Sequence, residues 1–139
     1  MGSEMCIRDS RNAWWLTAIN TPDSNAKLND FKAKVTLKNN AIATSGNYRN
    51  FYEVDGKKYA HTINPKTGYP EKNTLLSASI FAKDCMTADA YATACMVMGM
   101  DKAYQLISSD PALEGYFIYS DDAGEMQVKQ TSGVAAFLL

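Results

Sequence analysis

The chain has 139 residues, of which 46% are hydrophobic, and its formal net charge at pH 7 is −1. This length and apolar content are typical of one globular domain with a hydrophobic core, and they exclude a disordered chain. The lack of a basic excess argues against a nucleic-acid-binding protein. No apolar run approaches the roughly 20 residues that a helix needs to cross a bilayer.

The first ten residues, Met1–Ser10, match nothing that follows in pattern. They resemble a spurious leader, of the kind produced when adapter sequence is translated onto an incomplete gene. We therefore expect residues 1–10 to be non-native and leave them out of the fold prediction. Residues 11–139 are then expected to be the C-terminal part of one domain.

Strands are predicted along the first 82 residues by short apolar or alternating runs between turn signals. Phe31–Lys38 alternates apolar and polar residues, as a half-buried strand does. Asp55-Gly56 separates two strand-like runs and predicts a hairpin, because both turn positions favour positive φ. The expected strands are Trp14–Ile19, Phe31–Lys38, Ala41–Thr44, Tyr48–Val54, Lys57–Ile63 and Leu75–Ala82.

Two consecutive helices and a closing hairpin are predicted in the remainder. Thr87–Met98 is rich in alanine and is followed by Gly99, and Asp101–Ser109 ends before Asp110-Pro111. Tyr116–Ser120 and Glu125–Lys129 form the expected hairpin. Strands, then helices, then a hairpin predict an α+β fold with a mainly antiparallel sheet.

Asp89 and Thr93 are four residues apart, so on a helix they lie on the same face. A structural interpretation is open, because Asp89 near a helix N-terminus would favour the helix dipole and Thr93 could bond a carbonyl of its own helix. The functional alternative is a magnesium site, because magnesium takes few protein oxygens and leaves positions for water and phosphate.

His61 is the only histidine of the chain. It lies at the end of a predicted strand and leads into a rigid Pro-x-Thr-Gly turn, where Gly68 offers a left-handed position. Such a ring can accept a proton from a hydroxyl near neutral pH, although a satisfied structural histidine is the alternative. Ser45-Gly46 lies in a second small polar break that, by itself, indicates only a turn.

Taken together, motifs in these regions resemble the ApbE family, the FAD:protein FMN transferases, from roughly Trp15 to Gly133. The first is W-x-x-[GA]-I-x-x-P, and the second is A-T-S-G-x-Y with Phe51-Tyr52 and Asp55-Gly56-Lys57 after it. The third is H-x-[IL]-[DN]-P-[RK]-T-G-x-P, in which Asn64 stands where many members have aspartate, and the fourth is A-D-A-x-A-T-A. They are matched by Trp15, Ala18, Ile19 and Pro22, by Ala43–Tyr48, by His61–Pro70 and by Ala88–Ala94.

The resemblance implies a magnesium-dependent enzyme that moves FMN from FAD onto a threonine or serine hydroxyl of a target flavoprotein and releases AMP. It implies Asp89 and Thr93 as metal ligands and His61 as the candidate base beside the flavin phosphate. Ile63 would line the FAD pocket through its main chain. Ser45, Gly46, Thr67 and Gly68 would support that pocket.

Other expectations follow from the same resemblance. Residues 11–139 would be an incomplete, T-fold-like FMN transferase domain that is weakly active or inactive alone. Alternative functions are an FAD pyrophosphatase, which yields FMN and AMP, and a non-catalytic flavin-binding scaffold. Family members usually work on the periplasmic side of the cytoplasmic membrane, often as lipoproteins. Membrane association of this chain is expected only through an N-terminal anchor that the sequence lacks.

Overall fold

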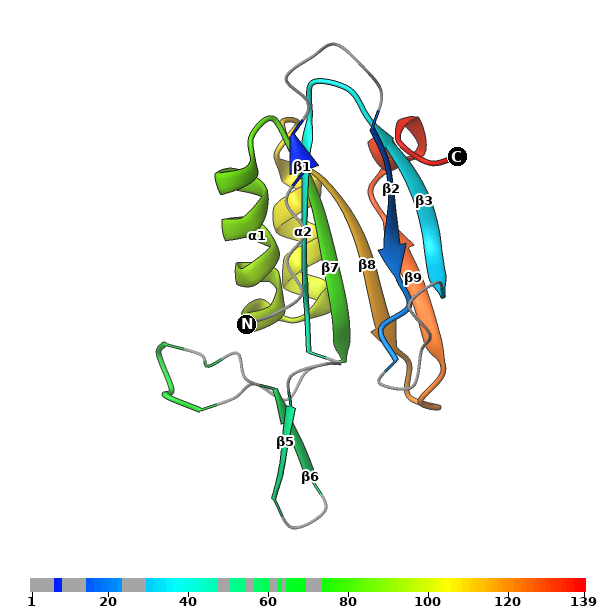
Figure 1. The fold of residues 1–139 in the computed structure, drawn as a ribbon. Helices are drawn as coiled ribbons and strands as arrows, with labels where there is room; N and C mark the ends of the chain where they lie inside the picture. Colours follow the sequence, from blue (N-terminus) through cyan, green and yellow to red (C-terminus); the bar gives the residue numbers. More distant parts are fainter. Residues whose placement is uncertain are drawn as a thin grey trace.

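A computed structural model describes residues 15–23, 30–47, 63, 65–69 and 74–139, together with the backbone of three short strands at 7–8, 51–54 and 57–60. Two helices lie on one side of a sheet, and a pair of strands lies on the other (Figure 1). None of the helices in these ranges is long and apolar enough to span a membrane.

The main sheet has five strands in the order β1-β4-β7-β8-β9, and every neighbouring pair is antiparallel. Two further antiparallel pairs are β2 with β3 and β5 with β6. The strands are β1 (Ile7–Arg8), β2 (Trp15–Asn20), β3 (Phe31–Leu37), β4 (Ala41–Gly46), β5 (Phe51–Val54), β6 (Lys57–Ala60), β7 (Leu75–Ala82), β8 (Glu114–Ser120) and β9 (Met126–Gln130).

The helices α1 (Cys85–Met98) and α2 (Met100–Ser109) cover one face of this sheet. α1 packs on β4 and β7, and α2 packs on α1 and β8. Small side chains allow close approach between helix and sheet, because Ala43 and Ala78 on the strands and Ala88 and Ala92 on α1 are fully buried in one cluster. Phe117 of β8 fills the space beneath α2 in the same cluster.

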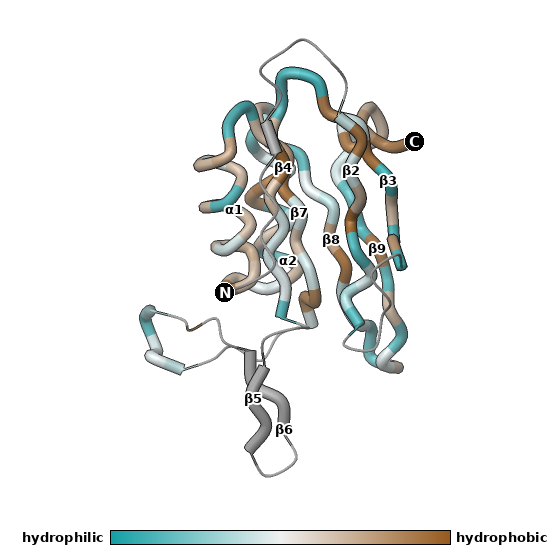
Figure 2. The backbone as a smooth tube through the Cα atoms, in the orientation of Figure 1, coloured by the Kyte–Doolittle hydropathy of each residue, from teal (hydrophilic) through white to brown (hydrophobic). Residues whose placement is uncertain are grey.

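The opposite face of the sheet is covered by β2, β3 and a 3-10 helix at Ser132–Ala136. Alternate residues of each strand supply this second core, as the pleat requires. Ile42, Phe81 and Ile118 point here, whereas their neighbours Ala43, Ile80 and Phe117 point to the helices. Figure 2 shows hydrophobic residues on these strands and hydrophilic residues in the turn that follows β3.

The α+β architecture with an antiparallel sheet, two consecutive helices and a C-terminal hairpin is confirmed. The β5–β6 pairing, with Val54 opposite Lys57, agrees with the hairpin predicted around Asp55-Gly56. β1, which pairs with the first two residues of β4, lies within residues 1–10. The division into a leader at 1–10 and a domain at 11–139 stays a prediction.

Several element boundaries differ from the predictions. β4 extends to Gly46, so Ser45 and Gly46 lie on a strand and not in the predicted turn, and β8 begins at Glu114 instead of Tyr116. α1 begins at Cys85, two residues before the expected start, because the Asp84 side chain accepts a hydrogen bond from Thr87 N at 2.8 Å and caps the helix. The 3-10 helix at Ser132–Ala136 was not expected. Its five residues are too few to produce a hydrophobic period that a sequence pattern can reveal.

Candidate functional site

The predicted metal pair lies on α1, and the structure weakens one of its structural explanations. Asp84 is the N-cap, and the first turn of α1 contains no acidic residue. Asp89 is therefore in the second turn, where the attraction of the helix dipole for a negative charge has largely fallen off. Stabilisation of the helix dipole therefore gives a weaker explanation of Asp89 in this fold.

One oxygen of Asp89 has an unusual environment. Oδ1 is buried and accepts no hydrogen bond from any residue in the described part of the chain. A buried acceptor without a partner costs roughly 1–3 kcal/mol of stability, and a charged group costs more. A carboxylate oxygen in this environment suits a hard cation. The residues present therefore fit a magnesium ion.

Thr93, one turn further along α1, contacts a residue of a different motif. Its Oγ1 lies 3.3 Å from Ser45 Oγ, a hydrogen bond in which either hydroxyl could be the donor. Ser45 is near the end of β4 and is only 6% exposed, whereas Thr93 is exposed. The structure thus brings Thr93, one of the two predicted metal ligands, into contact with Ser45, a predicted supporting residue of the FAD pocket.

The loop that follows β6 is only partly described. His61, the predicted base, lies outside the described residues, so its position relative to Asp89 stays a prediction. Ile63 is 56% exposed, and Thr67 and Gly68 are also exposed. The prediction of a left-handed glycine is confirmed, because Gly68 has φ +73°. Thr67 Oγ1 accepts a hydrogen bond of 3.3 Å from Tyr69 N within this turn.

Both ends of the segment between β4 and β7 are tied to the sheet by contacts that sequence reasoning missed. The Asn47 side chain donates from Nδ2 to Leu75 O at 3.1 Å, and Asn47 N donates to Leu76 O at 3.1 Å. At the other end, Ser120 N donates to Thr74 O at 2.9 Å. Asn47 occupies the variable position of A-T-S-G-x-Y, and that position alone gave no signal of this role.

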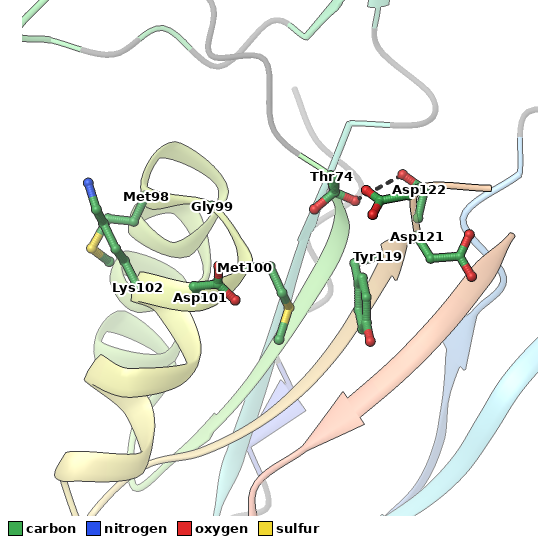
Figure 3. A pocket seen from close by; sticks show the side chains of 10 residues that line it. Thr74, Met98, Gly99, Met100, Asp101, Lys102, Tyr119, Asp121 and Asp122 are labelled. Carbon is green, nitrogen blue, oxygen red and sulfur yellow. Dashed lines mark hydrogen bonds between the residues drawn. The ribbon is translucent and has the colours of Figure 1, made fainter. Parts of the chain in front are cut away.

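A cavity of about 520 Å³ opens between the α1–α2 junction and the β8–β9 turn (Figure 3). It contains none of the predicted site residues. The side chains of Met100 and Tyr119 lie along it in Figure 3, and three aspartates and one lysine give it a polar rim. Its lining is Thr74, Met98, Gly99, Met100, Asp101, Lys102, Tyr119, Ser120, Asp121 and Asp122.

Asp121 organises the turn beside this cavity. Its carboxylate accepts hydrogen bonds from Gln127 Nε2 at 2.9 Å, from Glu125 N at 2.8 Å and from Ala123 N at 3.0 Å. The pKa of Asp121 lies below its ordinary value. The largest cause is the hydrogen bond from the Gln127 side chain, and the next is the backbone hydrogen bond from Glu125. These bonds favour the ionised carboxylate, because it offers more acceptor sites than the protonated group does.

The lowered pKa makes the stability of this turn sensitive to acid. A carboxyl whose folded pKa is depressed stabilises the fold above its unfolded pKa, and that contribution is lost as the pH falls through the folded pKa. We expect the unfolding free energy, measured by urea titration from pH 7 downward, to fall less in Asp121→Asn than in the wild type. Asp122→Asn removes the same charge from the same turn, so equal pH profiles for the two variants would contradict this role of Asp121.

Within the described ranges, no group of three or more His, Cys, Asp or Glu side chains is placed to hold a metal ion. Asp89 and Thr93 present two side-chain oxygens from neighbouring turns of α1. Magnesium is commonly held in this way, by one or two protein oxygens with water and substrate phosphate completing the shell.

Comparisons with known proteins identify relatives of the chain. The sequence model of the ApbE family matches residues 1–117. The FAD:protein FMN transferase of Escherichia coli strain K12 is 39% identical over 105 residues, which are 76% of this chain and 28% of that protein. The corresponding protein of Treponema pallidum is 38% identical over 100 residues, 72% of this chain and 26% of its own length.

Solved structures agree with the sequence comparison. The flavin transferase ApbE from Vibrio cholerae superposes with a TM-score of 0.73 at 32% identity. The match covers 89% of this chain and 38% of the Vibrio chain. The ApbE protein from Thermotoga maritima gives a TM-score of 0.72 at 30% identity, with the same coverage. The chain therefore spans well under half the length of the relatives that it matches.

Proposed function

This chain belongs to the ApbE family, and from that premise we propose that it is part of a magnesium-dependent enzyme that moves FMN from FAD to a protein. The acceptor is a threonine or serine hydroxyl of a target flavoprotein, and AMP is released. The names of the relatives support flavin transfer from FAD to a protein. The observation that supports the magnesium site is Asp89 Oδ1, which is buried, has no hydrogen-bond partner among the described residues and lies one helical turn from Thr93.

Asp89 and Thr93 would hold the magnesium ion, each through one side-chain oxygen. The bound ion would neutralise the charge of the pyrophosphate of FAD and orient it, which is the main requirement of phosphoryl-type transfer. Ser45 and Gly46 would lie beside the pair at the end of β4. Ile63, Thr67 and Gly68, on the exposed turn after β6, would border the flavin phosphate.

The acceptor hydroxyl would attack the phosphorus of the FMN half. A new bond would form between the acceptor oxygen and this phosphorus, while the bond from the phosphorus to the bridging pyrophosphate oxygen breaks. That bridging oxygen would leave with AMP. His61 would take the proton of the attacking hydroxyl and return it to solvent or product, since an imidazole titrates near neutral pH.

Two other functions use the same residues. In an FAD pyrophosphatase, water would replace the acceptor hydroxyl, and the products would be free FMN and AMP. In a non-catalytic scaffold, FAD would bind without cleavage. The relatives are FAD:protein FMN transferases, whose name specifies a protein acceptor, and this favours transfer.

The experiment that separates these functions incubates the full-length protein with FAD, Mg²⁺ and a peptide that carries a central threonine. AMP release together with an FMN-sized increase in peptide mass supports transfer. AMP with unmodified peptide supports hydrolysis, and bound FAD without AMP supports a scaffold. Failure of the full-length protein to bind FAD at all would contradict all three.

The 139-residue chain by itself is expected to bind FAD weakly and to turn over little. It aligns with only 28% of the Escherichia coli protein and 38% of the Vibrio cholerae chain. We expect the parts of a full-length enzyme that this chain does not align with to supply further contacts to FAD. Isothermal titration of the chain with FAD and Mg²⁺ measures this directly. Tight binding at one FAD per chain would contradict the expectation. A position on the periplasmic side of the cytoplasmic membrane is a further proposal, which cell fractionation tests.

A further inference from the structure

Two hydroxyl groups connect β4 to α1 at the proposed metal pair. Ser45 Oγ and Thr93 Oγ1 are 3.3 Å apart, although their residues are 48 positions apart in sequence. Ser45 is 6% exposed, so water reaches its side chain poorly. Its hydrogen-bonding capacity is therefore directed to protein neighbours, and Thr93 is one of them.

The contact follows from how α1 packs on the sheet. Ala43 and Ser45 are two residues apart on β4, so their side chains point to the same face, which is the face that α1 covers. Ala43, Ala88 and Ala92 are fully buried between the strand and the helix. Because these alanines are small, the helix lies close enough for the short Ser45 side chain to reach Thr93.

The chemistry of a hydroxyl ligand gives this contact a role. A hydroxyl that offers a lone pair to a cation still carries a proton, which needs an acceptor. Outer partners of this kind fix the orientation of metal ligands, and their loss typically costs about 10- to 100-fold in metal affinity. Ser45 Oγ lies within hydrogen-bonding distance of Thr93 Oγ1 and can be this acceptor. Asp89 lies one turn from Thr93 on α1, and its Oδ1 has no hydrogen-bond partner in the described ranges.

We propose that Ser45 is a positioning residue for the metal pair: its hydroxyl accepts the Thr93 Oγ1 proton and so turns the Thr93 lone pair toward the cation that Asp89 binds. This inference rests on the magnesium site of the proposed function. It gives Ser45 a role in addition to the support of the flavin pocket that the family resemblance implies.

The competing explanation is that the bond only satisfies a buried hydroxyl. The same sheet contains a matched pair for comparison, because Thr44 Oγ1 and Ser79 Oγ form a hydroxyl–hydroxyl bond of 2.7 Å between β4 and β7. Successive side chains of β4 point to opposite faces, so Thr44 lies on the face away from α1. Ser79 is fully buried, so Ser79→Ala removes a buried serine hydroxyl on the side remote from the metal pair.

The test measures Mn²⁺ binding to the full-length protein by the loss of the free-ion electron paramagnetic resonance signal, with Mg²⁺ as the competitor. We expect Ser45→Ala to weaken Mn²⁺ binding by about tenfold or more, while Ser79→Ala binds as the wild type does. Urea unfolding without metal gives the structural cost of each variant separately. If Ser45→Ala does not fold, Ser45→Cys keeps the side-chain size with a poorer acceptor, and its Mn²⁺ binding is expected to weaken in the same direction.

The outcomes separate this inference from the proposed function. Wild-type affinity in folded Ser45→Ala, or in folded Ser45→Cys if the alanine variant does not fold, overturns the positioning role and leaves the magnesium site standing. Equal weakening in Ser45→Ala and Ser79→Ala also overturns it, because a general loss of rigidity then explains both. If the wild type itself binds neither ion, the proposed magnesium site fails and the role of Ser45 fails with it.

Discussion

In the full-length protein, replacing Asp89 with alanine is expected to abolish the proposed Mg²⁺-dependent AMP release without lowering the stability of the metal-free protein. The carboxylate offers a direct ligand, so metal affinity should fall by more than the roughly 100-fold that the loss of an outer partner can cost. Metal-free stability should be unchanged or raised, because the substitution removes a buried oxygen that has no hydrogen-bond donor among the described residues. AMP release from FAD and urea unfolding measure the two effects.

Asp84, five residues earlier on the same chain segment, is the matched control. Its side chain caps α1 through Thr87 N at 2.8 Å and accepts from Thr87 Oγ1 at 3.0 Å. Asp84→Ala should lower the unfolding free energy by about 0.5–2 kcal/mol, as the loss of an N-cap does, and should retain Mn²⁺ binding. The reverse pattern, with Asp89→Ala destabilised and still able to bind metal, would assign Asp89 a structural role.

The largest effect on stability is expected from Phe117→Ala. Phe117 is fully buried under the two helices, and its ring lies edge-on to Tyr104 of α2, with ring centroids 6.3 Å apart. Truncation of a buried phenylalanine leaves a cavity and typically costs about 3–5 kcal/mol. The unfolding free energy from urea titration should fall by this amount, because the packing of α1 and α2 against the sheet is weakened.

Phe31 offers a control of the same residue type. It lies at the start of β3 and is 41% exposed. Phe31→Ala should cost about 1 kcal/mol or less, because surface substitutions rarely exceed this. Equal losses for the two phenylalanines would show that the cluster beneath the helices is not the main core of the protein.

Much of the fold could be predicted because local patterns and tertiary structure agree. The alternation in Phe31–Lys38 matches β3, whose Val35 and Leu37 are fully buried. Gly99, with φ +79°, ends α1 where the pattern stopped. The start of α1 was missed by two residues, although Asp84 and Thr87 have the spacing of a helix N-cap. The start of the helix is set by its N-cap residue, which the hydrophobic pattern does not reveal.

The site was predictable only in part, because its contacts cross between elements. The spacing of Asp89 and Thr93 placed both residues on one helix face. The Ser45–Thr93 bond depends on the packing of α1 against β4, which no local pattern contains. The role of Asn47 depends on the adjacency of β4 and β7. The cavity beside Gly99 likewise forms from segments that meet only in the folded chain.

The proposed magnesium site at α1 is tested most directly by a crystal structure of the full-length protein, crystallised with Mn²⁺, in which anomalous scattering locates the ion. The expected result is a peak at about 2.1 Å from Asp89 Oδ1 and from Thr93 Oγ1, with Ser45 Oγ still within hydrogen-bonding distance of Thr93. A protein whose α1 carries no peak, or whose Mn²⁺ lies instead among Asp101, Asp121 and Asp122, would contradict the assignment of Asp89 and Thr93 as metal ligands.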